Sequence, residues 1–163
     1  MSEQHAGDSI SFRPVTDSDE EFLLEVYRSS RGDDLRELGW DEDRIGEFLR
    51  MQYEAQKYFL QSDYPQASDE IILLADQPAG RLIVERRDHE IRCVDVALLP
   101  PHRSAGVGTL LIRKLQDEAK NRNQALRAQV IRFSRAVNLL ERLGFVRTSE
   151  TGTHFQMEWR PPG

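Results

Sequence analysis

The chain has 163 residues, of which 39% are hydrophobic and 31% are charged, a balance typical of one globular domain. Its formal net charge of −6 argues against nucleic acid or a membrane as a partner, because nucleic acids and anionic membranes repel an acidic protein. The single cysteine, Cys93, excludes an intramolecular disulfide, and no apolar stretch approaches the roughly 20 residues of a membrane helix. We therefore expect a cytoplasmic protein.

The chain reads as one domain preceded by a short leader. Residues 1–8 are polar and lack the apolar segment of a secretory signal, so we expect them to be flexible. Residues 9–163 contain no repeat, linker or low-complexity tract. The sequence therefore predicts a single domain over residues 9–163.

The first half of the chain predicts a strand, two helices and three further strands. Residues 10–15 alternate apolar and polar side chains, as a strand does, and residues 16–19 are types that begin helices. The helix that follows is expected to end at a turn near Gly32, and a second helix is expected over residues 41–61. Strands are then expected over residues 70–75, 81–86 and 91–99, the first two joined by a turn at residues 76–80.

The second half alternates helices and strands. An amphipathic helix opens within residues 102–108, and a further helix is capped by Ser134 and followed by Gly144. Strands are expected over residues 125–131, 145–147 and 153–159. A strand, a helix and a strand in succession favour a right-handed parallel crossover, whereas the earlier strands form hairpins. The predicted fold class is α/β, with a mixed sheet that is antiparallel in its first half.

The segment from Leu98 to Thr109, LLPPHRSAGVGT, carries the most chemical information. It places Gly106 and Gly108 in the first turn of a helix, where unpaired N–H groups and a partial positive charge gather. Glycine lets a ligand approach the backbone, and Arg103 adds a positive charge, so the loop suits a pyrophosphate. It lacks the Gly-Lys-Ser/Thr of a Walker A loop and the third glycine of a dinucleotide fingerprint. An ordinary strand–helix turn is the alternative interpretation.

Two motifs together resemble the GNAT superfamily of acyl-CoA-dependent N-acetyltransferases. The first is Arg-x-x-Gly-x-Gly at residues 103–108 after a strand and Leu-Leu-Pro, and the second is RAVNLLERLGF at residues 135–145. The resemblance extends over about residues 10–160, because the order of elements also matches. It implies a mostly antiparallel mixed sheet, with a parallel crossover at two splayed central strands and helices on both faces. It also implies acetyl-CoA as co-substrate, a small-molecule or protein amine as acceptor, and an ability to form homodimers.

The resemblance implies a cofactor site along the end of the strand at 91–99 and the loop after it. The backbone of Leu98 would pair with pantetheine, and the Leu98 N–H would polarise the thioester carbonyl as an oxyanion hole does. Leu99 is included in the cofactor site. The pyrophosphate would be wrapped by the backbone of Arg103, Ser104, Ala105, Gly106, Val107, Gly108 and Thr109. The histidines lack metal-ligand spacing, so we expect no metal site.

The implied reaction is direct attack of a neutral primary amine on the thioester, which requires a base. Asp95 is the first candidate, because a charge inside an apolar strand is costly unless it is paired or functional. The alternative is a structural ion pair between Asp95 and Arg127 on the next strand. Cys93 is expected to be a buried apolar side chain rather than a nucleophile.

The acid that protonates the leaving thiolate is not evident in the sequence. Leu140 stands where many members of the family carry a tyrosine, and leucine cannot donate a proton. Either another group substitutes, or the thiolate leaves unassisted, or the chain is an acyl-CoA-binding module with little or no turnover. The candidate substitutes are Ser134, Tyr53, Tyr58 and Tyr64.

Overall fold

The computed structural model describes residues 10–103, 106–132 and 134–163. The order of its helices and strands is the predicted one, with two short 3-10 helices, η1 and η2, in addition. The elements are β1 (Ile10–Pro14), η1 (Asp17–Asp19), α2 (Glu20–Glu37), α3 (Glu42–Asp63), β2 (Ser68–Leu74), β3 (Gln77–Arg86), β4 (Glu90–Leu98), η2 (Pro100–His102), α4 (Val107–Arg122), β5 (Ala125–Ile131), α5 (Arg135–Arg142), β6 (Val146–Glu150) and β7 (His154–Trp159).

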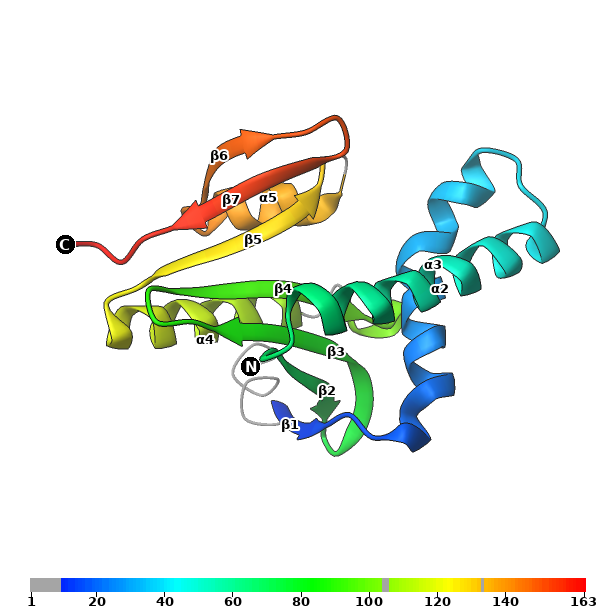
Figure 1. Cartoon of the computed structure of the whole chain (residues 1–163), viewed down its shortest axis with the longest axis horizontal. Coiled ribbons are helices and arrows are strands. Elements are labelled where there is room, and N and C mark those ends of the chain that lie inside the picture. The colour runs from blue at the N-terminus through cyan, green and yellow to red at the C-terminus, as the bar shows by residue number, and fades with distance from the viewer. Residues whose placement is uncertain (1–9, 104–105, 133) are drawn as a thin grey trace.

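All seven strands form one sheet in the order β1-β2-β3-β4-β5-β7-β6 (Figure 1). The central strands β4 and β5 are parallel and are joined through α4, whereas the other five neighbouring pairs are antiparallel. This arrangement confirms the predicted mixed, mostly antiparallel sheet with a parallel crossover at its middle.

The neighbouring residues Ile71 and Ile72 show that helices cover both faces of the sheet. Both are fully buried, at 0% exposure, and consecutive strand residues point to opposite faces. Ile72 belongs to the larger core cluster, which includes Leu111 of α4 and Leu140 of α5. Ile71 belongs to the smaller cluster, which includes Leu49 of α3 and residues of α2. The prediction of helices on both faces is thus confirmed.

Capping residues fix where the helices near the centre of the sheet begin and end. Gly106, at the N-cap of α4, has a φ of 77°, a conformation that glycine adopts without strain. The Ser134 hydroxyl accepts a hydrogen bond from the Ala136 N–H at 3.0 Å and so caps α5, as its sequence position predicts. Gly144 follows α5 with a φ of 95°, and a Cβ there would lie 3.3 Å from Trp159 Cδ1.

The largest departures from the predicted boundaries are at the end of α2 and at the start of β3. The helix α2 continues through Gly32 to Glu37, because the left-handed residue that ends its last turn is Gly39, with a φ of 87°. The strand β3 begins at Gln77, within the turn predicted at residues 76–80. The reversal between β2 and β3 is tighter than predicted, since it is centred on two residues with positive φ, Ala75 (47°) and Asp76 (67°). Among the residues described, no helix combines the length and apolarity needed to cross a bilayer.

Candidate active site

The central strands β4 and β5 separate part-way along their length. Parallel pairing joins residues 90–93 to residues 125–128 and stops there, although β4 continues to Leu98 and β5 to Ile131. Beyond this point β4 pairs with β3, and β5 pairs with β7. Figure 1 shows the two strands diverging toward their C-terminal ends. The last residues of β4 therefore have a strand on one side only.

The backbone of Leu98 is directed toward this separation. The Leu99 N–H donates to the Ala79 carbonyl at 2.8 Å, so Leu99 faces the neighbouring strand β3. Successive residues of an antiparallel strand direct their N–H and C=O groups to opposite sides, and Leu98 therefore directs its own toward β5. The Leu98 N–H therefore points toward the separation of the two strands, while the side chain is buried in the core.

Arg103 folds back onto the protein. Its N–H closes the η2 turn on the Pro100 carbonyl at 3.2 Å. Its Nε donates to the Leu98 carbonyl at 3.0 Å, and its Nη2 donates to the Ser29 carbonyl of α2 at 2.6 Å. Sequence reasoning considered the Arg103 side chain only as a positive charge for a phosphate, and it missed that this side chain ties the loop to both β4 and α2.

The N-terminus of α4 follows this loop. The Leu110 N–H donates to the Gly106 carbonyl at 3.1 Å, which is the first bond of the helix. The N–H groups of residues 107–109 therefore have no acceptor within the helix. Ser104 and Ala105, which were also predicted to bind the cofactor, lie outside the described residues. Among the described residues, the predicted backbone cradle thus centres on Val107, Gly108 and Thr109.

Asp95 lies in a polar cluster that sequence reasoning did not find. This residue is half-buried, and its side chain lies on the sheet face that α2 and α3 cover. The side chains come from two helices and two strands, so no local sequence pattern signals the cluster. The polar residues around a small void beside Asp95 are Tyr27, Arg31, Gln56 and Arg81.

The surroundings of Asp95 change its acidity. Burial raises the pKa of the Asp95 carboxyl, while the charges of Arg31 and Arg81 act in the opposite direction. Arg81 is itself buried and donates to Asp69 at 2.8 and 2.6 Å. Within the described part of the chain, Asp95 forms no ion pair shorter than 4.0 Å. A carboxylate with a raised pKa accepts protons more readily near neutral pH, as a general base must.

Arg127, the alternative partner considered for Asp95, is engaged elsewhere. Its Nη1 donates to Glu90 at 2.7 Å and its Nε donates to Glu158 at 2.8 Å. Arg127 lies opposite Arg92 in the paired part of β4 and β5, whereas Asp95 lies beyond the point at which pairing stops. The predicted ion pair between Asp95 and Arg127 is therefore wrong.

Leu140, which stands at the position of the family's tyrosine acid, is a core residue with 3% exposure. The side chains considered as substitutes for that acid mostly have structural roles. Tyr53 is buried, its hydroxyl donates to Glu20 at 3.3 Å, and burial raises its pKa, so it anchors α3 to α2. The Ser134 hydroxyl caps α5. Tyr58, at 77% exposure, projects from α3 into solvent.

Cys93 is a core residue. It is buried in the larger cluster, and burial raises the pKa of its thiol to about 12, so the nucleophilic thiolate is scarce at neutral pH. Among the described residues, no group of three or more His, Cys, Asp or Glu side chains is arranged to hold a metal ion.

A cavity of about 780 Å³ lies between α2 and α3 and is bordered by Pro100. Charged residues of both signs line it, among them Arg28, Glu47 and Arg50. None of the predicted site residues that the structure describes borders this cavity. We therefore place the candidate site at the separation of β4 and β5 rather than in the cavity.

Comparisons with known proteins agree with this geometry. A family model described as an acetyltransferase (GNAT) domain matches residues 68–147, about half of the chain, including β4, α4, β5 and α5. No curated protein matches the sequence.

Several solved structures share the fold. PaiA N-acetyltransferase from Thermoplasma acidophilum, solved with coenzyme A, has a TM-score of 0.71 at 19% identity, covering 94% of this chain and 99% of that one. The histone acetyltransferase HPA2 and related acetyltransferase from Corynebacterium glutamicum has a TM-score of 0.64 at 21% identity, with coverage of 95% and 97%. The ribosomal-protein-S18-alanine N-acetyltransferase from Escherichia coli has a TM-score of 0.63 at 16% identity, with 93% of each chain covered.

At these identities the solved structures establish the architecture, and the family model covers the splayed strands and the helix that follows them. The family model includes both segments whose motifs carried the resemblance, residues 98–109 and 135–145. On this evidence the chain belongs to the GNAT superfamily of acetyltransferases.

Proposed function

We propose that the chain is an N-acetyltransferase that moves the acetyl group of acetyl-CoA to a primary amine. The observation that carries the proposal is the separation of β4 from β5 directly beside the open N-terminus of α4. Such a site offers an extended backbone edge to a pantetheine chain and a partly positive helix end to a pyrophosphate. The similar PaiA enzyme, which has this fold, was solved with coenzyme A, and this supports the same co-substrate here.

The pantetheine and pyrophosphate parts of the cofactor each have complementary groups in the chain. Pantetheine extended along β4 would meet the N–H of Leu98, and the phosphates would meet the N–H groups of residues 107–109. Arg103 contributes charge near the phosphates, although its guanidinium donates to two carbonyls. The Leu98 N–H would donate to the thioester oxygen as it gains negative charge, and a donor of this kind typically accelerates acyl transfer by about 10²–10³-fold.

Asp95 is the proposed acceptor of the proton that the amine must lose. An alkyl amine has a pKa of about 10.4 and is mostly protonated at pH 7, so a base must generate the neutral nucleophile. Asp95 precedes Leu98 by three residues, and its side chain lies on the α2 and α3 face of β4. An amine approaching from that face would meet Asp95 before the thioester. The coenzyme A thiolate then leaves without an acid at the position of Leu140.

A second candidate function is an acyl-CoA-binding module with little or no turnover. The observation that favours it is the burial of Leu140, where many members of the family carry a tyrosine acid. The two candidates share the cofactor site and differ in whether coenzyme A is released. The buried, unpaired Cys93 fits a reducing compartment, and we place the protein in the cytoplasm under either function.

Thermal unfolding with acetyl-CoA, followed by a coenzyme A release assay over a panel of primary amines, tests the proposal. At 100 times its dissociation constant the ligand adds about 2.7 kcal/mol, which raises the midpoint by roughly 5–10 °C. The rise should be lost in Gly106→Val, which strains the start of α4, and kept in Gly152→Val, whose added side chain meets open space. A rise with amine-dependent release supports the enzyme, and a rise without release supports the binding module. No rise in the folded wild-type protein contradicts both.

A further inference from the structure

The side chain of Arg103 joins two parts of the protein that meet at the candidate site. Its Nε donates to the carbonyl of Leu98, the last residue of β4, at 3.0 Å, and its Nη2 donates to the Ser29 carbonyl of α2 at 2.6 Å. Both bonds have a charged donor, and such bonds are roughly twice as strong as bonds between neutral groups. The guanidinium therefore connects the end of a strand to a helix residue that lies 74 positions before Arg103 in the chain.

The stretch of α2 that Arg103 holds is the one beside Asp95. Tyr27 and Arg31 of α2 border the small void next to Asp95, and Ser29 lies between them in the chain. The Arg31 guanidinium stacks on the Tyr27 ring, 3.9 Å from its centroid, so these two side chains are linked to each other. A shift of Ser29 would therefore move the groups that surround the proposed base.

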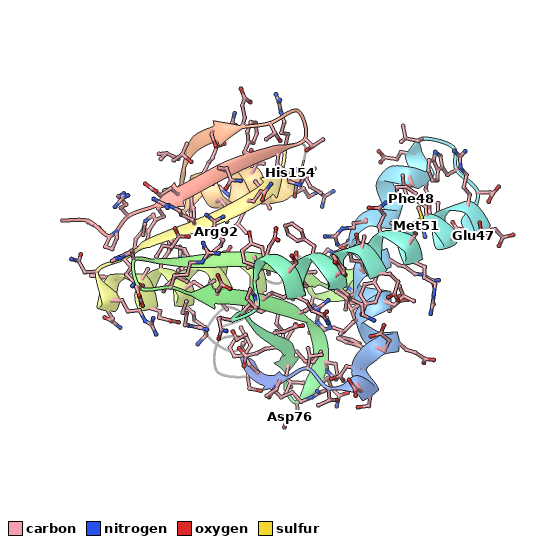
Figure 2. The ribbon with its side chains drawn as sticks, viewed as in Figure 1. Glu47, Phe48, Met51, Asp76, Arg92 and His154 are labelled. Carbon is pink, nitrogen blue, oxygen red and sulfur yellow. The ribbon has the colours of Figure 1, made fainter. Side chains whose placement is uncertain are left out.

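The other end of the bridge is the residue that supplies the proposed oxyanion donor. In Figure 2, Arg92 marks the paired part of β4, and from there the strand runs toward α2. Leu98, at the end of the strand, directs its N–H and its carbonyl to the same side, toward the separation of β4 and β5. A carbonyl oxygen accepts two hydrogen bonds, so the bond from Arg103 leaves one lone pair for pantetheine. The bridge is thus compatible with a bound cofactor.

These bonds also limit what Arg103 can offer to a phosphate. Its backbone N–H already donates to the Pro100 carbonyl at 3.2 Å. A guanidinium that turned to a phosphate through Nε or Nη2 would have to give up Leu98 or Ser29. The geometry therefore favours a role in which the two carbonyls are the ligands of the side chain.

We infer that Arg103 is a positioning residue, which holds the stretch of α2 beside Asp95 against the end of β4 that carries the Leu98 N–H. The inference rests on the proposed acetyl transfer and adds a residue that acts through the two groups it joins. The base and the oxyanion donor must both fit one bound substrate, and a displacement of about 1 Å can cost about 10²-fold in rate. Lysine carries the same charge on a single nitrogen and cannot reproduce the planar pair of donors.

Two substitutions separate this role from that of a charge for phosphate. The assays are coenzyme A release with ethylamine at saturating acetyl-CoA and calorimetric binding of acetyl-CoA. We expect Arg103→Lys to lower the rate of release by about tenfold to hundredfold and to change the dissociation constant of acetyl-CoA by less than about threefold. The inference is overturned if Arg103→Lys keeps the rate within about twofold while Arg103→Gln weakens acetyl-CoA binding by about tenfold, because Arg103 would then act as a charge.

The matched control is Arg113→Lys. Arg113 is an exposed arginine on α4 beyond its first turn, so this substitution should change neither the rate nor the dissociation constant. All three variants should unfold within about 3 °C of the wild-type midpoint, since both arginines are exposed.

Amide hydrogen exchange tests the bridge without turnover. In Arg103→Lys, the amides of residues 26–31 should exchange at least tenfold faster than in the wild-type protein, while those of α5 should not change. Unchanged exchange at residues 26–31 overturns the inference, whatever the rate of acetyl transfer. A wild-type protein that binds acetyl-CoA but releases no coenzyme A with any amine contradicts the proposed function instead. Faster exchange in the variant then still supports Arg103 as the residue that positions α2.

Discussion

Replacement of Asp95 by asparagine separates a catalytic carboxylate from a structural one. Asparagine has nearly the same shape and cannot accept the proton of an ammonium group at neutral pH. Loss of a positioned general base typically costs about 10²–10⁴-fold in rate, so we expect Asp95→Asn to lower kcat/KM by that factor. Acetyl-CoA affinity should stay within about twofold, because the Leu98 backbone and the start of α4 are untouched.

The sign of the stability change follows from the pKa of Asp95. Burial raises that pKa above the ordinary 3.8, so the folded state holds this proton more tightly than the unfolded state does. The contribution of Asp95 to stability therefore falls as pH rises from about 3.8 through its raised folded pKa. Above that range the ionised group is unfavourable in the fold. At pH 7 the uncharged asparagine should leave the free energy of unfolding unchanged or higher.

Asp69→Asn is the matched control, because Asp69 is the other aspartate near Arg81. Arg81 has a side chain only 7% exposed, and removal of its partner should cost about 3 kcal/mol in urea unfolding. The assays are coenzyme A release from pH 5 to 9 and urea unfolding of both variants. An Asp95→Asn variant that retains activity within about threefold refutes the base assignment. One that loses stability as Asp69→Asn does shows that Asp95 is a structural charge.

Three further substitutions or modifications probe the frame around the site. Burial raises the pKa of the Cys93 thiol to about 12, so this thiol should resist a thiol reagent at pH 8 in the native protein and react fully in denaturant. Rapid reaction in the native protein would show that the thiol is accessible. Arg127→Met removes the bridge between the carboxylates of β4 and β7 and should lower the free energy of unfolding by about 1–3 kcal/mol in urea, whereas no change would mean that the bridge is solvated. Gly144→Ala places a Cβ 3.3 Å from Trp159 at a residue whose φ is 95°, so it should lower the thermal midpoint by roughly 2–8 °C. An unchanged midpoint would show that the turn relaxes without strain.

The features that the sequence predicted well depend on residues close together in the chain. Gly106 and Ser134 begin helices through their own backbone or side chain, and Gly144 ends one in the same way. The order of elements follows from such signals and from the spacing of apolar residues. Local signals of this kind are therefore sufficient to predict the fold class.

The features that were missed depend on register and on distant contacts. The Asp95–Arg127 prediction failed because the sequence does not indicate where the parallel pairing of β4 and β5 stops. The contact of Gln56 with Asp95 joins a helix to a strand 39 positions later in the chain, and the bond from Arg103 to Ser29 spans 74 positions. Neither contact leaves a periodic pattern. The sequence therefore indicated Asp95 as a candidate base, but the residues around it became known only with the three-dimensional arrangement.

Amide hydrogen exchange by NMR at Leu98, with and without saturating acetyl-CoA, tests most directly whether the separation of β4 and β5 is the cofactor site. The Leu99 amide is an internal control, because it already donates to Ala79 and should be protected in both states. The account predicts that exchange at Leu98 and at residues 107–109 slows by at least tenfold on binding, while Leu99 changes little. Unchanged exchange at Leu98 in the saturated protein would contradict it.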